Sequence, residues 1–336
     1  MRPSMLLIPA LAATLFEATA AAQTTASLIA GVGNFSHIAA NLDRSVAFYR
    51  DVLGLEMNGE ARPFDANPAI MKMGNTPGAQ SRFAMLRVPG SQLGVEVIEY
   101  KDIDRKPADP GFQDPGAANL ILTVRDLDAV MARVKKAGTR IVTQAGGPVT
   151  MDAGKGASFR VVFLKDPDGF FVEVSERNPT PSTTAPAASN VIGGSFELIV
   201  NSTEQTAKFY REALGFDLQV GAAFAGDKLR METAGTPGAQ YRRSAATIPG
   251  STVQMAFLEF KDIARKPLMT RVQDPGTAIL QLRVRDVDAA AKALKAAGGT
   301  VISEGGAPVD FNGRRIALVR DPNNLFFELL PAPPAR

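Results

Sequence analysis

The supply of histidine and cysteine sets the first limit on the chemistry of this chain, because the sequence has one histidine, His37, and no cysteine. A single chain of this composition cannot build a two-histidine iron site or a three-histidine zinc site. Thiolate nucleophiles, disulfides and cysteine-ligated metals are excluded as well. The groups left for acid–base or metal chemistry are carboxylates, amides, hydroxyls and His37, as one ligand or as a general base.

Charge and length limit the class of protein. The 336 residues include 37 Lys and Arg against 34 Asp and Glu, a net charge of +3, and the two signs are interspersed. Nucleic-acid binding needs a concentrated basic face, so we expect no nucleic-acid partner. The length exceeds what one hydrophobic core usually supports and predicts about two domains.

Residues 1–22 have the three parts of an export signal. Arg2 supplies the positive charge, Met5–Phe16 supplies 12 mostly apolar residues, and Ala20–Ala22 supplies the small residues of a cleavage site. Twelve residues are too few to cross roughly 30 Å of hydrocarbon as a helix. We therefore expect cleavage before Gln23, export to the periplasm or the exterior, and no stable membrane anchor.

The sequence repeats itself at an offset of 160 residues. The motif Thr-Pro-Gly-Ala-Gln occurs at 76–80 and 236–240, and Gln-Asp-Pro-Gly occurs at 113–116 and 273–276. Such a repeat predicts two homologous domains. We place them at 30–177 and 191–333, joined by a Pro/Ser/Thr/Ala-rich linker at 178–190.

Each predicted domain divides into two units with the same order of elements. In the first unit a strand over 32–40 precedes a helix that starts after Asn41 and stops at Gly54, and strands over 82–88 and 93–100 follow. The pattern predicts an α+β protein of four βαβββ units. The predicted units are 30–100, 118–177, 193–261 and 278–331.

The helix motifs at 48–54 (Phe-Tyr-Arg-Asp-Val-Leu-Gly) and 209–215 (Phe-Tyr-Arg-Glu-Ala-Leu-Gly) resemble those of the vicinal oxygen chelate superfamily. This superfamily contains glyoxalase I, bleomycin-resistance proteins and extradiol dioxygenases. Further resemblance lies at 124–129, 284–289, 166–173 and 321–328, and it covers nearly all of 30–333. It implies two tandem glyoxalase-like domains, in which two units form a cup with a divalent metal on its floor.

In that family the metal ligands are commonly a histidine on the first strand of a unit and a glutamate on the last. The resemblance places Glu96 and Glu173 at the glutamate positions of the first domain, and Asn34 and Asn119 at the histidine positions. Amide oxygens are poor ligands for zinc or iron but acceptable to magnesium, calcium or manganese. A divalent metal in the first domain is therefore an open expectation, of unknown identity.

His37 is the remaining candidate for a third ligand. It stands three residues after Asn34, and an odd offset along a strand puts it on the opposite face, towards the helix. Only a bulge would turn it into the cup.

The second domain departs further from the family. Its residues at the four ligand positions are Ser195, Ala256, Ile279 and Glu328. One carboxylate and one hydroxyl are fewer ligands than a catalytic metal requires, so we expect no metal there.

Three functions follow from the resemblance. The first is binding of a small molecule in each cup without the histidine ligands, with Asn34, Asn119 and Ser195 as ligand-binding residues. The alternative is a metal-dependent glyoxalase-like lyase or isomerase that uses Glu96 or Glu173 as ligand or proton carrier. A vestigial structural or interaction role is the third. A two-histidine extradiol dioxygenase is excluded.

The loop between the first helix and the next strand is also informative. Phe64, Ile70, Met71 and Met73 predict an apolar lid over the cup. Four units can close two cups within one chain, so a monomer suffices, and the sequence leaves a dimer open.

Overall fold

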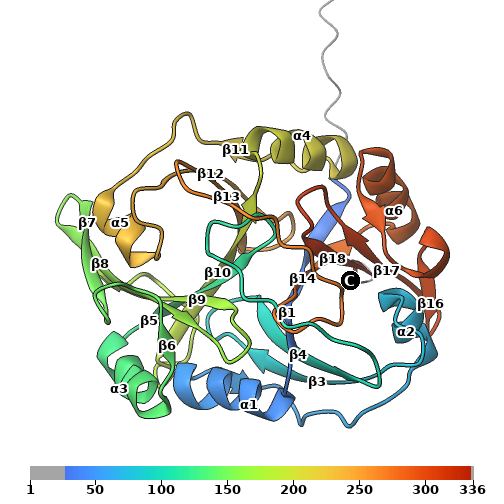
Figure 1. The fold of residues 1–336 in the computed structure, drawn as a ribbon, viewed down its shortest axis with the longest axis horizontal. Coiled ribbons are helices and arrows are strands. Elements are labelled where there is room, and N and C mark those ends of the chain that lie inside the picture. Colours follow the sequence, from blue (N-terminus) through green and yellow to red (C-terminus); the bar gives the residue numbers. More distant parts are fainter. Residues whose placement is uncertain (1–26, 334–336) are drawn as a thin grey trace, which may run out of the picture.

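The computed structural model of the chain describes residues 27–333, which form two nine-stranded sheets with helices packed between them (Figure 1). The mixed α+β class predicted from the sequence is confirmed. The predicted export signal lies outside the described residues. Within residues 27–333, no helix is both long and apolar enough to cross a bilayer.

Each of the four units begins with a long strand and a helix and ends with two antiparallel strands, and a short helix (first and third units) or a further strand (second and fourth units) lies between them. The first unit has β1 (Ile29–Ala39), α1 (Leu42–Ala47) with η1 (Phe48–Leu53), β2 (Glu56–Met57), α2 (Pro68–Gly74), β3 (Gln80–Arg87) and β4 (Gly94–Lys101). The second has β5 (Ala118–Val124), α3 (Leu127–Ala137), β6 (Arg140–Ile141), β7 (Val149–Gly154), β8 (Ala157–Lys165) and β9 (Phe171–Asn178). The third has β10 (Val191–Val200), α4 (Thr203–Leu214), β11 (Gln219–Val220), α5 (Lys228–Thr233), β12 (Gln240–Thr247) and β13 (Gln254–Lys261). The fourth has β14 (Ala278–Val284), α6 (Val287–Ala296), β15 (Thr300–Val301), η2 (Glu304–Gly306), β16 (Val309–Phe311), β17 (Arg314–Arg320) and β18 (Phe326–Pro331).

The first helix of each half begins and ends where the sequence predicts. The side chain of Asn41 accepts a hydrogen bond from the backbone N–H of Arg44 at 2.9 Å, and Gly54 ends the helix with φ of 89°. In the second half Ser202 caps α4, and Gly215 ends it with φ of 62°.

The units pair across the two halves of the chain. Sheet A joins the first and fourth units through antiparallel β1 and β14, and sheet B joins the second and third through antiparallel β5 and β10. The expectation that the first and second units share one cup is therefore wrong. The first strand of every unit offers a free edge of similar pattern, so the repeat does not reveal which edges meet.

The two sheets pack through their helix-facing sides. The ring of Phe35 on β1 stacks on that of Phe196 on β10 at 5.8 Å, and one continuous core includes both. Figure 1 shows α1 and α3 at one edge of this core and α4 and α6 at the other. The opposite faces of the sheets, here called inner face A and inner face B, therefore point away from each other and correspond to the predicted cups.

A short helix covers part of each inner face. Met71 and Met73 of α2 pack with Tyr100 of inner face A, and Met231 of α5 packs with Phe260 of inner face B. The predicted apolar cover over the first cup is present. Phe64 is not part of it, since its ring lies against the cationic groups of Arg82 and Lys101, 5.0 and 4.5 Å from the ring centre.

Candidate functional site

Two carboxyl groups meet on the floor of inner face A. Glu96 comes from β4 and Glu328 from β18, and both lie beside Gln281 of β14. The amide Nε2 of Gln281 donates a hydrogen bond to Oε2 of each glutamate at 2.9 Å. Ser36 Oγ donates to the same oxygen of Glu96 at 2.6 Å. One amide thus bridges the carboxyl pair.

Both groups of the carboxyl pair have a raised pKa. Burial and, after it, the negative charge of Glu96 together raise the pKa of Glu328 to about 8, against the hydrogen bond from Gln281. Burial also raises the pKa of Glu96, against the hydrogen bond from Ser36. Since the two groups interact strongly, they titrate as a pair, and the pair takes up a proton at a higher pH than an isolated glutamate does.

Asn34 holds the bridging amide in place through its backbone. Its N–H donates to Oε1 of Gln281 at 2.9 Å, which leaves Nε2 of Gln281 directed at the carboxyl pair. The Asn34 side chain is partly exposed on inner face A, and its Nδ2 lies 3.2 Å from the sulfur of Met85. Its predicted role in binding a ligand stays a prediction.

The residues of inner face A do not fit the divalent metal that the family implies. With the observed pairing of units, the family's ligand positions on this face are Asn34, Glu96, Ile279 and Glu328. They offer no imidazole, and Ile279 offers no donor at all. The N–H groups of Gln281 point at the two carboxylates, where a cation would have to bind. Zinc and iron sites need a stronger donor set.

Inner face B has a different carboxyl pair. Glu173 of β9 lies near Glu197 of β10, and burial together with the charge of Glu197 raises the pKa of Glu173 to about 7. Glu197 pairs with Arg243 of β12, whose Nε lies 3.2 Å from Oε1. Asn119 of β5 is completely buried beside Glu173, whose pKa its amide lowers, and neither atom of that amide makes a hydrogen bond of normal geometry. Ser195 lies on the same face and is partly exposed.

The expected grouping of Glu96 with Glu173 is wrong, because the two residues belong to different sheets. Each has another partner, Glu328 in sheet A and Glu197 in sheet B. Glu328, expected to be a lone carboxylate, is half of a pair. Glu197 is a site residue that sequence reasoning missed. The sequence did indicate Glu197, because it follows Ser195 by two residues in a mostly apolar strand and therefore lies on the same face as Ser195.

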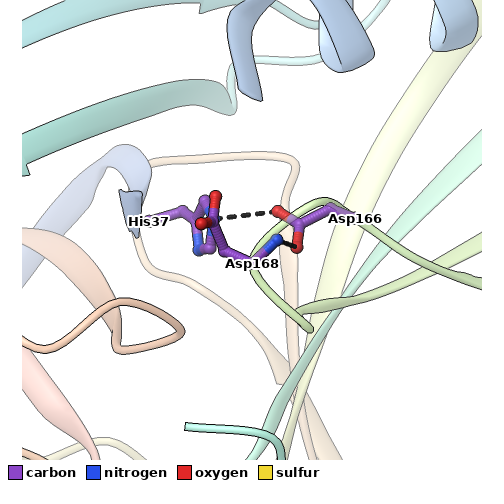
Figure 2. Close-up of side chains that lie close together, drawn as sticks. All are labelled: His37, Asp166 and Asp168. Carbon is purple, nitrogen blue, oxygen red and sulfur yellow. Dashed lines mark hydrogen bonds and ion pairs between the residues drawn. The ribbon is translucent and has the colours of Figure 1, made fainter. Parts of the chain in front are cut away.

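His37 faces the helices, as its offset from Asn34 predicts, so it does not join either inner face. Figure 2 shows it beside Asp166 and Asp168, with Nε2 at 2.8 and 3.4 Å from their Oδ2 atoms. Burial alone lowers the pKa of His37, but the charges and hydrogen bonds of the two aspartates raise it to about 10. Because His37 faces the helices and its Nε2 bonds the two aspartates, it does not join Glu96 or Glu173 as a third ligand on an inner face.

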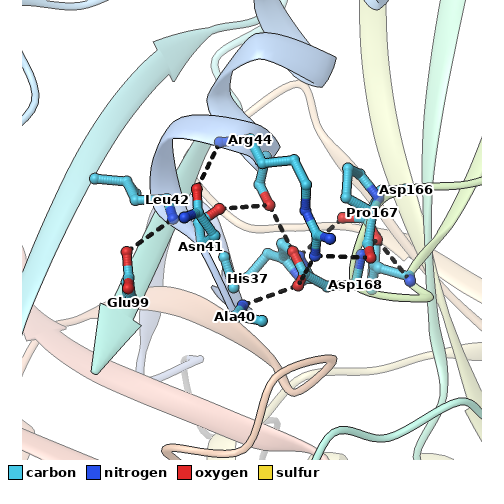
Figure 3. Close-up of polar contacts among 12 residues, drawn as sticks. His37, Ala40, Asn41, Leu42, Arg44, Glu99, Asp166, Pro167 and Asp168 are labelled. Carbon is cyan, nitrogen blue, oxygen red and sulfur yellow. Dashed lines mark hydrogen bonds and ion pairs between the residues drawn. The ribbon is translucent and has the colours of Figure 1, made fainter. Parts of the chain in front are cut away.

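The aspartates join the second unit to the first helix (Figure 3). Asp168 accepts hydrogen bonds from the N–H of Ala40 at 2.8 Å and from the Ser45 hydroxyl at 2.5 Å. Asp166 accepts from the hydroxyl of Tyr49 at 3.0 Å. Among residues 27–333, His37 and these aspartates form the single group of three potential ligand side chains within 4.8 Å. Because protein donors already occupy their oxygens, we describe the group as a structural clamp.

A groove lies over this clamp, away from both inner faces. It has a volume of about 830 Å³, and the corresponding groove of the second half has about 240 Å³. Its charged groups pair with one another: Arg44 with Asp168, and Arg140 and Lys165 with Asp109. We assign it no ligand.

Comparison with known proteins places these observations in a family. The family described as the Glyoxalase/Bleomycin resistance protein/Dioxygenase superfamily matches residues 31–174 and 194–329. The lactoylglutathione lyase of Oryza sativa is 28% identical over 180 residues, 53% of this chain and 51% of that protein. The lactoylglutathione lyase of Haemophilus influenzae is 28% identical over 142 residues, 42% of this chain and 89% of that protein.

The chain spans about half the length of the plant relatives that it matches. Among solved structures, glyoxalase I from Zea mays matches with a TM-score of 0.57 and 17% identity, over 89% of this chain and 92% of that chain. At this identity the likeness concerns the fold alone. The matches in both halves confirm the resemblance found in the motifs, and the chain belongs to the Glyoxalase/Bleomycin resistance protein/Dioxygenase superfamily.

Proposed function

We propose that this protein is an exported member of the superfamily that binds a small molecule on its inner faces without a histidine-ligated metal. The observation that carries the proposal is the bridge that Gln281 makes between Glu96 and Glu328. In this bridge a protein amide donates hydrogen bonds to the two carboxylates that stand at the metal-ligand positions of the family. A Lewis-acid step needs an open position on a bound cation, and this floor does not provide one.

The walls of inner face A support binding. Phe83, Met85 and Ile98 alternate with core residues on β3 and β4, and their side chains are partly exposed. Small-molecule sites combine such apolar walls with a few fixed polar groups. The Glu96–Glu328 pair supplies a hydrogen-bond acceptor and, when one of its carboxyl groups is protonated, a donor.

Export is part of the proposal and rests on residues 1–22. Their charge, apolar run and small residues have the composition of a cleaved signal. We expect the protein recovered from an expressing bacterium to begin at Gln23 and to leave the cytoplasm. Full-length protein retained with the cytoplasmic fraction would contradict this part.

Chelator treatment tests the proposal. The full chain is dialysed against EDTA, and a library of small polar aromatic compounds is screened by thermal shift before and after dialysis. We expect the same compounds to raise the melting temperature in both samples, because the protein's own groups make the contacts. Binding that disappears with EDTA and returns with manganese or zinc would contradict it.

A metal-dependent lyase is the second candidate, favoured by the retention of Glu96 and Glu328 and by the relatives named lactoylglutathione lyase. It requires that a cation displace the Gln281 amide. Lactoylglutathione lyase activity that EDTA abolishes would support this candidate. Failure of both activity and ligand binding would favour a structural role.

A further inference from the structure

Inner face B carries cations that have no acidic partner. Arg177 at the end of β9 lies over the ring of Phe159 at 5.9 Å, and Arg230 of α5 lies over the ring of Tyr241 at 4.7 Å. In the part of the chain that the structure describes, neither guanidinium has a carboxylate oxygen within 4.0 Å. Both charges act on Glu173, where they oppose the rise in its pKa, so they lie close to the floor.

The floor below these cations holds an unsatisfied amide. Asn119 has no exposed surface, and neither its Nδ2 nor its Oδ1 makes a hydrogen bond of normal geometry, although the amide lies close enough to Glu173 to lower the pKa of that carboxyl. In the register of the sheet it lies between Phe171 and Glu197. Buried polar groups are nearly always hydrogen-bonded in native proteins, so an orphaned amide at a floor needs an explanation. A ligand that reaches it would supply the missing partners.

The charge balance of this face favours an anion. Arg243 already compensates Glu197, and Arg177 and Arg230 remain as surplus positive charge beside Glu173. The neighbouring walls are aromatic, and Phe159 and Tyr241 are partly exposed. Cations over aromatic walls suit a ligand that carries a negative charge on an apolar body.

The duplication within the chain provides an internal comparison. At the positions of Arg230, Arg243 and Asn119, inner face A has Ile70, Phe83 and Ile279. Ala332 stands four residues after Glu328, as Arg177 stands four residues after Glu173. Inner face A therefore lacks an arginine or an amide at these positions, and its own cations stand elsewhere: Arg283 acts on Glu328, and Arg320 lies over the ring of Phe326 at 5.9 Å.

We propose that inner face B binds an aromatic monocarboxylate, whose carboxylate contacts Arg177 and Arg230 and whose hydroxyl or carbonyl group contacts the amide of Asn119. This inference rests on the proposed function and assigns a ligand class to one of its two faces. The aromatic body lies against Phe159 and Tyr241.

Three probes separate the contributions of charge and hydroxyl. Binding of 4-hydroxyphenylacetate, its neutral amide and phenylacetate to the full chain is measured by calorimetry. We expect the carboxylate to bind at least about tenfold more tightly than the amide. Arg230→Ile and Arg177→Ala each weaken carboxylate binding by about tenfold. Asn119→Ile removes the advantage of 4-hydroxyphenylacetate over phenylacetate.

These substitutions copy the residues that inner face A carries, and circular dichroism verifies that each variant is folded. Arg283→Thr is the matched control, since it removes an arginine from sheet A and copies Thr123 of sheet B. It leaves binding of the probes unchanged.

Two results would overturn the inference while the proposed function stands. One is equal affinity for the carboxylate and the amide, which would show binding without charge recognition. The other is carboxylate binding that Arg283→Thr weakens and Arg230→Ile does not. Absence of binding by all three probes also overturns it, and the chelator experiment then decides the proposed function separately.

Discussion

At the scale of single residues, His37 and Asp168 form a buried pair of charges that the second half of the chain lacks. The corresponding residues there are Leu198 and Asn323, while Asp321 keeps its hydrogen bond from Tyr210 at 3.0 Å. Asn323 donates to the Thr206 hydroxyl at 3.1 Å. The first half thus has a histidine and a second aspartate where the second half has Leu198 and Asn323, and both halves keep one buried aspartate that bonds a tyrosine.

This exchange predicts strong coupling between the two sites. His37→Leu alone leaves Asp166 buried without a counter-charge and Asp168 with only the partly exposed Arg44, and we expect it to lower the free energy of unfolding by about 3–5 kcal/mol. Addition of Asp168→Asn restores most of the loss, because the pair then matches Leu198 and Asn323. Urea unfolding of the two single variants and the double variant measures the coupling. Additive effects would show that the charges do not depend on each other.

The raised pKa of His37 predicts a pH dependence of stability. Its pKa is about 10 in the folded protein against an ordinary 6.5, so the folded state binds the proton more tightly. The stabilisation is complete below pH 6.5 and is lost as the pH rises towards 10. Relative to His37→Leu/Asp168→Asn, the wild type loses about 1.4 kcal/mol per pH unit in this range. Parallel stability curves would rule out a charged His37.

At the scale of elements, the close approach of β1 to β14 sets the position of Gln281. A Cβ atom on Gly33 would lie 2.7 Å from both Cβ and Oε1 of Gln281, whereas one on Gly31 would have no contact closer than 3.7 Å. The next N–H, that of Asn34, holds the amide oxygen. The strand pairing and the carboxyl bridge are thus parts of one arrangement.

Alanine substitutions at these glycines test that arrangement. Gly33→Ala forces β1 and Gln281 apart and costs about 1–3 kcal/mol of unfolding free energy. Gly31→Ala is the matched control. It fits without a clash and is neutral or stabilising by about 0.4–1 kcal/mol, because it restricts the unfolded chain. Similar losses for both variants in chemical denaturation would contradict the close approach.

Most elements could be predicted from the sequence, since local signals specify them. Asn41 and Gly54 mark the ends of the first helix, and strand alternation placed His37 on the helix side. The same alternation along the strand could have identified Glu197 as an inner-face residue. The role of Gln281 could not be predicted in this way, because it depends on contacts between units far apart in the chain.

At the scale of the whole molecule, the exchange of partners between halves is what local patterns could not predict. The four first strands are similar, and long-range packing decides which edges meet. As a result each carboxyl pair on an inner face combines two units, Glu96 with Glu328 from the two ends of the chain and Glu173 with Glu197 from its middle.

This topology predicts that half of the chain cannot remain a monomer. Residues 27–178 contain β1 and β5 without their partners β14 and β10. Unpaired edge strands tend to form hydrogen bonds with a strand of another chain. We expect this fragment to form a dimer in which β1 of one copy pairs with β5 of the other. Light scattering after size exclusion gives the mass, and a stable folded monomer would contradict the pairing.

The metal content of the full chain is the most direct test of the central claim that the Gln281 amide takes the place of a metal. The chain is purified without chelator, loaded with manganese, zinc or iron, desalted and analysed by mass spectrometry. We predict substoichiometric metal in the wild type and a gain of metal in Ile279→His/Gln281→Ala, which removes the bridge and adds an imidazole. Near-stoichiometric metal in the wild type, lost in both Glu96→Ala and Glu328→Ala, would contradict the account.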